Sequence, residues 1–298
     1  MTKKKQKKNG VRKIDVKKDR FLVTGGTGSL GRHIIKKLLN LGAKNIISIS
    51  RNEDLIKQAE LEINSPYVKF KIGNISDEEM IKNLMERVDV VFHTAAIKHV
   101  SLAEQNPREA YRANISGLLN ILNASSSLKR FVHTSSDKAI GVMNCYGATK
   151  LLGEYLVRES NELYNDDSYL VIRCPNFLGS RGSVLDMWKK QLANANKIKI
   201  SDPDMTRYFI TLPNATEFIV DMGLTDKPDA KKIYYPLKYT KKFRLEDLAK
   251  AFLKVHGNKT SSIQITGATP GEKKHEDYIS DVSLTPISEL VSMIDQLV

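Results

Sequence analysis

The 298-residue chain has few of the features that cross-link or anchor a protein. It contains only two cysteines, Cys145 and Cys174, so it offers no disulfide framework and suits a reducing cytoplasm. No apolar run approaches the roughly 20 residues that a membrane-spanning helix needs. The N-terminus is basic, but no hydrophobic segment follows it, so we expect no secretory signal. The sequence therefore predicts a cytoplasmic protein without a membrane span, and we expect no metal site.

Positive charge is concentrated at the N-terminus. The formal net charge is +13, and residues 1–20 supply +8 of it because ten Lys or Arg residues face only two Asp there. We expect residues 1–19 to be a disordered basic tail, with the folded unit beginning near Arg20. A solubilising role is favoured over tethering to RNA or another anionic surface, so nucleic acid is not the expected partner.

Beyond the tail, short apolar runs typical of strands alternate with helical patterns. This alternation predicts a Rossmann-type, doubly wound parallel sheet of the α/β class over residues 20–175, which we expect to bind the cofactor. Strands are expected at 20–24, 45–50, 67–72, 88–94, 130–134 and 169–173, and helices at 32–39, 55–63, 77–87, 107–125 and 146–164.

The spacing of apolar residues becomes irregular after Cys174. Residues 176–298 are expected to form a smaller substrate-binding lobe over the carboxyl edge of the sheet, with some segments returning to the Rossmann core. Expected elements are helices at 184–194, 213–223, 245–255 and 286–297 and strands at 197–200, 206–211 and 263–266.

A glycine-rich segment lies between the first expected strand and helix. Glycines there permit a tight turn and let the backbone approach a pyrophosphate at the helix N-terminus. This strand-loop-helix context predicts a dinucleotide site. The candidate residues of the loop are Gly25, Thr27, Gly28, Ser29, Leu30 and Gly31.

The end of the second strand distinguishes NAD from NADP. An acidic residue at this position would bind the ribose hydroxyls of NAD, but the chain has Arg51 and Asn52. A guanidinium can stack on adenine and pair with a ribose phosphate, which favours NADP. Further residues assigned to the cofactor are Asn74, Ile75, Ala95, Ala96, Lys98 and Asn114.

Two short motifs carry the expected catalytic chemistry. Tyr146 and Lys150 are four residues apart, so they share one helix face, where the ammonium can lower the pKa of the phenol. Asp137 and Lys138 follow the strand at 130–134, at the edge where such sheets bind ligands. A base, an acid and an ammonium are thus expected at one site.

At this point the chain resembles the extended short-chain dehydrogenase/reductases, and within them the inverting UDP-N-acetylglucosamine 4,6-dehydratases. The likeness covers residues 20 to 280. It is carried by the glycine loop, by Ala95-Ala96-Ile97-Lys98-His99-Val100 with Glu104 and Asn106-Pro107, by the Ser-Asp-Lys-Ala and Tyr-x-x-x-Lys motifs, by Asn176–Val184 with Met205-Thr206-Arg207, and by Pro270–Glu276.

The resemblance implies a role for each catalytic residue. Tyr146 removes the carbon-4 hydroxyl proton as hydride passes to NADP, Lys150 holds the nicotinamide ribose, and Ser136 steadies the sugar hydroxyl. Lys138 then removes the carbon-5 proton and Asp137 assists departure of the carbon-6 hydroxyl, after which hydride returns to carbon 6. The resemblance also implies a homo-oligomer, a dimer or hexamer. Residues expected around the UDP-sugar are Lys98, Asn176, Arg181, Val184, Arg207 and Glu272.

Tyr146 favours the inverting branch, because retaining members tend to carry Met at that position. Three departures from the family pattern involve four positions: Cys174-Pro175 replace Tyr-Gly, Thr269 replaces an Arg, and Asn74 replaces an acidic residue. A nucleotide-sugar 4-epimerase or 4-reductase remains the enzymatic alternative. A catalytically silent NADP-binding sensor or RNA-associated protein is the alternative of another class.

Overall fold

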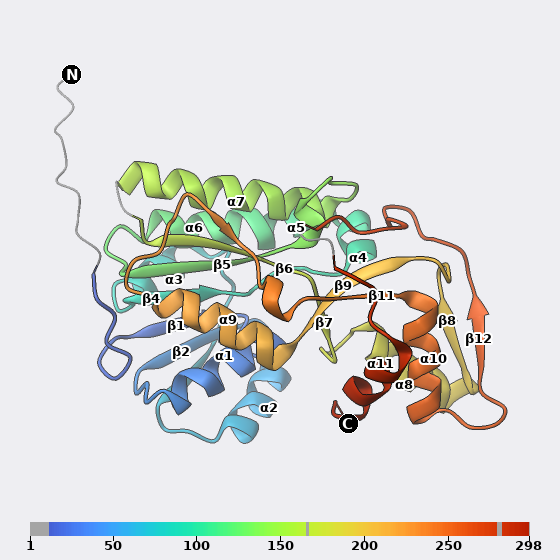
Figure 1. Cartoon of the computed structure of the whole chain (residues 1–298). Helices are drawn as coiled ribbons and strands as arrows, with labels where there is room; N and C mark the ends of the chain where they lie inside the picture. The colour runs from blue at the N-terminus through green and yellow to red at the C-terminus, as the bar shows by residue number, and fades with distance from the viewer. Residues whose placement is uncertain (1–11, 165–166, 279–281, 298) are drawn as a thin grey trace.

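A seven-stranded parallel sheet forms the centre of the molecule (Figure 1). The computed structural model describes residues 12–164, 167–278 and 282–297. The strands lie in the order β10-β6-β5-β4-β1-β2-β3, and every pairing is parallel. Their bounds are β1 Phe21–Thr24, β2 Ile46–Ser50, β3 Val68–Ile72, β4 Val90–His93, β5 Arg130–Ser136, β6 Tyr169–Cys174 and β10 Ile233–Tyr234. The expected doubly wound sheet is confirmed.

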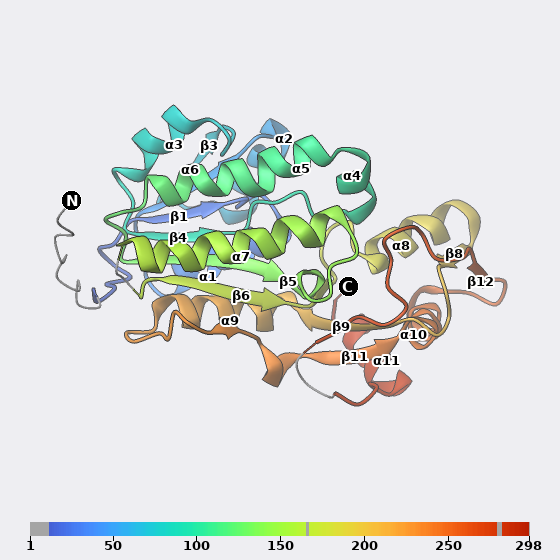
Figure 2. The ribbon, with the colours of Figure 1, turned by 90° about the horizontal axis from the view of Figure 1, so that it is seen from above.

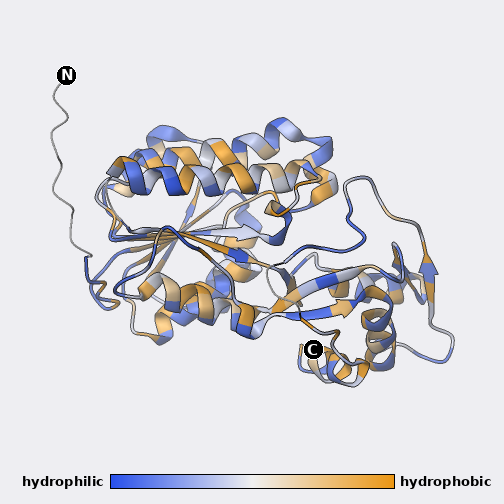
Figure 3. Cartoon of the chain, turned by 45° about the horizontal axis from the view of Figure 1, so that its top comes forward, coloured by the Kyte–Doolittle hydropathy of each residue, from blue (hydrophilic) through white to orange (hydrophobic). Residues whose placement is uncertain are grey.

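Helices cover both faces of this sheet, and each carries hydrophobic and hydrophilic residues along its length (Figure 3). One face packs against α1 and α9, and the other packs against α3, α6 and α7, so the sheet is buried between two apolar layers. The helices of this part are α1 Ser29–Asn40, α2 Glu53–Ile63, α3 Glu78–Met85, α4 Val100–Gln105, α5 Pro107–Tyr111, α6 Gly117–Asn123, α7 Cys145–Tyr164 and α9 Leu212–Leu224.

The strand order reverses direction between β1 and β4. Chain connections run from β1 outward to β2 and β3, and then from β4 outward to β5 and β6. In open α/β sheets the loops at the carboxyl ends of two such strands run in opposite directions, and ligands bind between them. The glycine loop follows β1 and the Asp137-Lys138 segment follows β5, so both motifs lie at this edge.

A smaller lobe lies beyond the carboxyl ends of the sheet strands (Figure 2). Its core contains Trp188, Phe209, Phe243 and Phe252, all buried. One three-stranded sheet, β11-β9-β7, and one two-stranded sheet, β12-β8, support it. The elements are β7 Asn176–Leu178, α8 Val184–Ala195, β8 Lys197–Ile200, β9 Thr206–Thr211, the 3₁₀ turn η3 Leu237–Tyr239, β11 Lys241–Arg244, α10 Leu245–His256, β12 Ser262–Ile265 and α11 Ile287–Asp295.

The single helix expected over residues 107–125 is interrupted. A π-helical turn, η1 Arg112–Ser116, separates α5 from α6. The amide side chain of Asn114 is buried in this turn, where it accepts from Ile97 N at 2.8 Å and donates to Thr149 Oγ1 at 2.9 Å. The extra residue of a π turn thus places the Asn114 side chain between Ile97 and Thr149. The spacing of apolar residues in the sequence does not reveal such a turn.

Residues 12–19 contact the body of the protein, although they were expected to belong to the tail. Ile14 and Val16 pack against the core beneath the sheet, and the buried Asp19 carboxylate pairs with Lys129 at 2.6 Å. The folded part therefore begins before Arg20. Residues 1–11, the rest of the expected tail, lie outside the described residues.

Deleting residues 1–18 is expected to lower the melting temperature by about 2–8 °C without changing turnover. The deletion removes two partly buried aliphatic side chains, worth about 1–3 kcal/mol together, and such a loss shifts the midpoint of a chain of this size by a few degrees per kcal/mol. Deleting residues 1–11 alone is the control, because it retains Ile14 and Val16. Equal melting temperatures of the two deletions would contradict the packing role.

Candidate active site

The Asp137-Lys138 pair lies directly after the last residue of a buried strand. All seven residues of β5 are buried, and the short 3₁₀ turn η2, Asp137–Ala139, continues from Ser136. The Asp137 side chain has no exposed surface, while that of Lys138 is 18% exposed. A charged pair is therefore fixed in a largely water-excluded position at the carboxyl edge of the sheet.

Three donors converge on the Asp137 carboxylate. Ser136 Oγ donates to Oδ1 at 2.7 Å, Lys138 Nζ donates to the same oxygen at 3.2 Å, and Asn176 Nδ2 donates to Oδ2 at 3.3 Å. Asn176 also accepts from Lys138 Nζ at 3.0 Å and donates to the carbonyl of Tyr208 at 2.8 Å. The amide of Asn176 therefore holds both charged side chains and ties them to β9 of the lobe.

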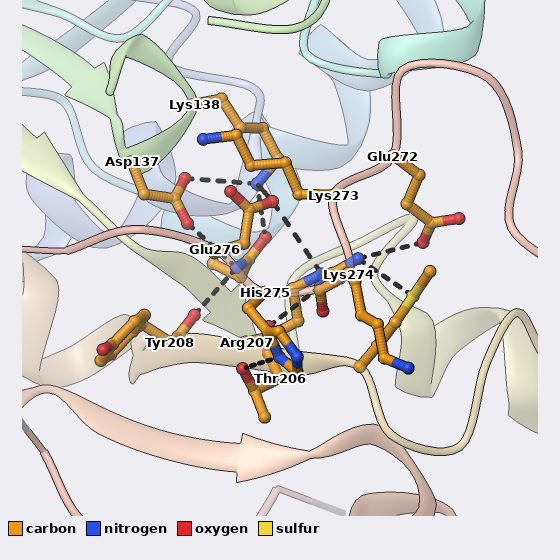
Figure 4. A network of polar contacts seen from close by, with 12 residues as sticks. Asp137, Lys138, Thr206, Arg207, Tyr208, Glu272, Lys273, Lys274, His275 and Glu276 are labelled. Carbon is orange, nitrogen blue, oxygen red and sulfur yellow. Dashed lines mark hydrogen bonds and ion pairs between the residues drawn. The ribbon is translucent and has the colours of Figure 1, made fainter. Parts of the chain in front are cut away.

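A second carboxylate, Glu276, approaches Lys138 from the C-terminal part of the chain (Figure 4). Its Oε1 lies 3.5 Å from Lys138 Nζ and 3.9 Å from Nε of Arg207 on β9. Arg207 in turn pairs with Glu272 at 3.2 Å. Glu276 belongs to the Pro270–Glu276 motif but was not among the predicted site residues. Its position at the end of that motif was the only available signal.

Electrostatics keep Lys138 charged. Burial by itself lowers the pKa of this ammonium, but Asp137 and Glu276 oppose burial and raise the pKa above its ordinary value. Tyr146, which lies beside Lys138, acts in the same direction and raises the pKa of the ammonium further. At neutral pH Lys138 is thus an ammonium, and it must lose a proton before it can act as a base.

Tyr146 and Lys150 lie on α7 as expected. Burial has the largest effect on the pKa of each side chain. Burial raises the pKa of Tyr146 to about 12, against the opposing effects of Lys138 and Ser136. Burial also lowers the pKa of Lys150 to about 8, and its Nζ donates to the carbonyl of Thr134 at 2.6 Å. The expected lowering of the phenol pKa by Lys150 is therefore not found, because desolvation outweighs the nearby charges.

A buried ion pair fixes α7 against the strands that carry the site. Glu154 on α7 is 2% exposed, accepts from Ser135 Oγ at 2.5 Å and pairs with Arg173 Nε at 2.7 Å. Arg173 also donates to the hydroxyl of Tyr235 at 2.7 Å. Ser135 belongs to β5 and Arg173 to β6. The two contacts of Glu154 therefore hold α7, the helix that carries Tyr146, against both strands.

The glycine loop has the geometry that a pyrophosphate requires. Gly25 has a positive φ of 69°, and a Cβ there would lie 2.9 Å from the backbone of Ala95. A Cβ on Gly31 would lie 2.4 Å from the carbonyl oxygen of Gly25. The first turn of α1 holds no acidic residue, so its positive end can attract an anion. Thr27 Oγ1 bonds Ser50 Oγ at 2.8 Å, and Leu30 is buried.

The residues expected around the adenine half lie along the next two strand ends. Arg51 is exposed directly after β2, where its guanidinium is accessible. Asn52 accepts from Leu55 N at 2.9 Å and caps α2, while Asn74 accepts from Ser76 N at 3.1 Å. Ile75 is buried in the core beside α6. The side chains of Asn52, Asn74 and Ile75 thus have structural contacts of their own.

The residues expected between the cofactor and the sugar occupy the loops after β4 and β7. Ala95 and Ala96 follow β4, next to the glycine loop. Lys98 Nζ donates to the carbonyl of Arg181 at 2.9 Å, and Arg181 N donates to Ser29 Oγ at 3.0 Å. These contacts bring the lobe onto the N-terminus of α1. Val184 instead begins α8 and packs against the lobe core.

Comparison with known proteins agrees with this arrangement. A model of a family described as polysaccharide biosynthesis protein matches residues 21–294. The chain belongs to this family. An inverting UDP-N-acetylglucosamine 4,6-dehydratase of Campylobacter jejuni is 36% identical over 88% of the chain and 78% of its own length. The resemblance inferred from the sequence is confirmed.

Other relatives in the family differ in length and in name. An uncharacterized membrane protein of Methanocaldococcus jannaschii is 35% identical over 92% of this chain and 84% of that protein. Among the described residues, no helix is both long and apolar enough to cross a membrane. The chain spans 46% of EpsC, a probable polysaccharide biosynthesis protein of Bacillus subtilis, at 34% identity over 89% of the chain.

Solved structures share the architecture. Pen from Bacillus thuringiensis superposes with a TM-score of 0.86 over 96% of this chain and all of that chain, at 27% identity. The dTDP-glucose 4,6-dehydratase DesIV from Streptomyces venezuelae superposes with a TM-score of 0.77 at 18% identity, covering 93% of this chain and 91% of that chain. The fold is that of the extended short-chain dehydrogenases.

Proposed function

We propose that the protein is an NADP-dependent UDP-N-acetylglucosamine 4,6-dehydratase that inverts carbon 5. The observation that carries this proposal is the buried Asp137-Lys138 pair held by Asn176 at the carboxyl end of β5, beside Tyr146. A 4-epimerase needs Tyr146 and Lys150 but has no elimination for an Asp-Lys pair to perform. The relatives named as inverting dehydratases, at 35–36% identity, support the same substrate.

Each side chain has a role in this proposal. Tyr146 first loses its phenol proton to solvent, and the resulting phenolate takes the carbon-4 hydroxyl proton while Ser136 orients that hydroxyl. Lys138 removes the carbon-5 proton once a 4-keto group has acidified it, and Asp137 assists departure of the carbon-6 hydroxyl. Arg207 and Arg181 bind the diphosphate. Carbon-5 inversion requires that the new proton arrive on the opposite face of the sugar.

The residues present fit a nicotinamide dinucleotide. The backbone of the glycine loop and the N-terminus of α1 would hold its pyrophosphate, Arg51 would hold a ribose phosphate, and Lys150 would hold the nicotinamide ribose. The cofactor supplies reversible hydride transfer. The DesIV structure, in which NAD is bound, supports this class of cofactor.

Incubation of the purified protein with UDP-N-acetylglucosamine, without added reductant, tests the proposal. We expect a nucleotide sugar that has lost one water, detected by mass spectrometry. Proton NMR of a reaction run in heavy water should then show that the carbon-5 proton signal is lost to deuterium and that carbon 5 has the inverted configuration. A strict requirement for stoichiometric reductant would exclude the internal hydride cycle.

A 4-epimerase is the second candidate, because three relatives at 30% identity are named UDP-glucose 4-epimerase. The same incubation separates the two functions. An epimerase would return a sugar of unchanged mass with a new configuration at carbon 4. Unchanged substrate with bound cofactor would indicate a binding protein.

Arg51→Asp is expected to shift cofactor preference from NADP towards NAD by about 10- to 150-fold. The change removes a charged partner for the phosphate, worth about 1.5–3 kcal/mol, and adds an acceptor for a free 2′-hydroxyl. Titration of the variant with both cofactors measures the ratio. Lys57→Asp is the matched control, since it makes the same charge change on an exposed face of α2. An unaltered ratio in Arg51→Asp would show that Arg51 is only a solvated charge.

A further inference from the structure

Glu276 is a buried carboxylate with an unusual set of neighbours. Its side chain is 5% exposed, and within the described part of the chain its Oε2 has no hydrogen-bond partner. Among the same residues, its other oxygen contacts two cations, Lys138 at 3.5 Å and Arg207 at 3.9 Å. The carboxylate therefore retains an open acceptor position beside the Lys138 ammonium.

Asp137 is a poorer acceptor for a proton from Lys138. Its two oxygens already accept hydrogen bonds from Ser136, Lys138 and Asn176, so less of its acceptor capacity is open. Glu276 also contacts the Lys138 ammonium, through Oε1 at 3.5 Å (Figure 4). The Nζ–Oε1 distance of 3.5 Å exceeds a typical N–H···O distance of about 2.9 Å by little, so transfer needs only a small side-chain movement.

We propose that Glu276 is a positioning residue that accepts the proton of Lys138 and so makes Lys138 a free amine before it attacks the carbon-5 proton. This inference rests on the dehydratase function proposed above. The charged and titratable groups around the pair are Asp137 on the same turn, Tyr146 on α7, Arg207 on β9 and, behind Arg207, Glu272.

The proton balance of the elimination step is closed within the site, and the proton that carbon 5 later receives comes from solvent. An N–H bond of Lys138 breaks and an O–H bond forms on Glu276. The freed nitrogen lone pair takes the carbon-5 proton, and the C–H electron pair moves into the enolate of the 4-keto group. That pair then forms the carbon-5 to carbon-6 double bond as the carbon-6 hydroxyl leaves with the proton from Lys138, assisted by Asp137. The proton stored on Glu276 returns to Lys138, so both residues regain their initial forms and one water is released.

Glu276→Gln is expected to change the shape of the pH profile of dehydration. The wild-type rate should vary little around neutral pH, because the pair transfers a proton internally. In the variant Lys138 must lose its proton to solvent, so the rate should rise about tenfold per pH unit through the neutral range, whereas the wild-type profile stays level. A larger isotope effect with carbon-5-deuterated substrate at pH 7 is expected as well.

Two further variants separate this role from a structural one. Glu276→Asp retains a carboxylate and is expected to restore the level pH profile. Asp277→Asn is the matched control, because its exposed carboxylate pairs with Lys273 at 2.7 Å rather than with Lys138. Should Glu276→Gln not fold, Glu276→Ala with added formate provides the same test, and formate is expected to restore the level profile.

The outcomes distinguish the two proposals. A wild-type protein that releases no water overturns the dehydratase function. A wild-type protein that dehydrates, together with a Glu276→Gln variant whose profile stays level with pH, overturns only the role of Glu276. Failure of formate to rescue a folded Glu276→Ala variant has the same meaning.

Discussion

Lys138→Ala is expected to reduce dehydration by about 10²- to 10⁴-fold, the usual cost of removing a general base. The fold should persist, because Asp137 keeps its bonds from Ser136 and Asn176. Oxidation at carbon 4 does not use Lys138, so reduced cofactor should accumulate on the variant and be visible by its absorbance. Mass spectrometry of the sugar and this absorbance are the two measurements.

Lys138→Arg is the informative companion. A guanidinium can keep the ion pairs with Asp137 and Glu276 but cannot deprotonate at accessible pH, so it cannot act as a base. We expect it to be as inactive as the alanine variant. Near-full turnover in either variant would assign the carbon-5 proton to another group.

Tyr146→Phe is expected to stop both oxidation and dehydration, again with a loss of about 10²- to 10⁴-fold. Hydride cannot leave carbon 4 unless the hydroxyl proton is removed, and phenylalanine has no group to receive it. Unlike Lys138→Ala, this variant should show no absorbance of reduced cofactor. Tyr155→Phe is the control, because Tyr155 lies on the same helix but is 61% exposed. Reduced cofactor in the Tyr146 variant would contradict this assignment.

Local sequence was sufficient to place most of the site. Strand-loop-helix order puts the glycine loop after β1 and Asp137 after β5, because parallel strands share one carboxyl edge. The spacing of Tyr146 and Lys150 likewise follows from helix geometry alone. These inferences concern residues near each other in sequence or fixed by the topology.

Features that depend on tertiary packing could not be predicted. The pKa of Tyr146 follows from its burial between segments that meet only in the fold, and spacing alone pointed in the opposite direction. Glu276 reaches Lys138 across 138 residues of chain through a loop without periodicity. Ile14 and Val16 are isolated aliphatic residues in a basic segment, so no helical or strand periodicity in the sequence indicates that they pack against the core. The π turn at Asn114 was hidden because α and π helices share similar apolar spacing over one turn.

The order in which the site residues are synthesised follows from the way that the chain runs through the fold. Asp137, Lys138 and Tyr146 leave the ribosome early, with strands that can already pair into a sheet, because N-terminal parts of a chain fold first. Arg207 comes later, and Glu276, which completes the charge cluster, comes later still. Strands β1 to β6 are thus translated before Arg207 and Glu276, whereas α9 and β10, which complete the cover and the edge of the same sheet, follow Arg207, so the nucleotide-binding half and the charge cluster are both completed late in translation.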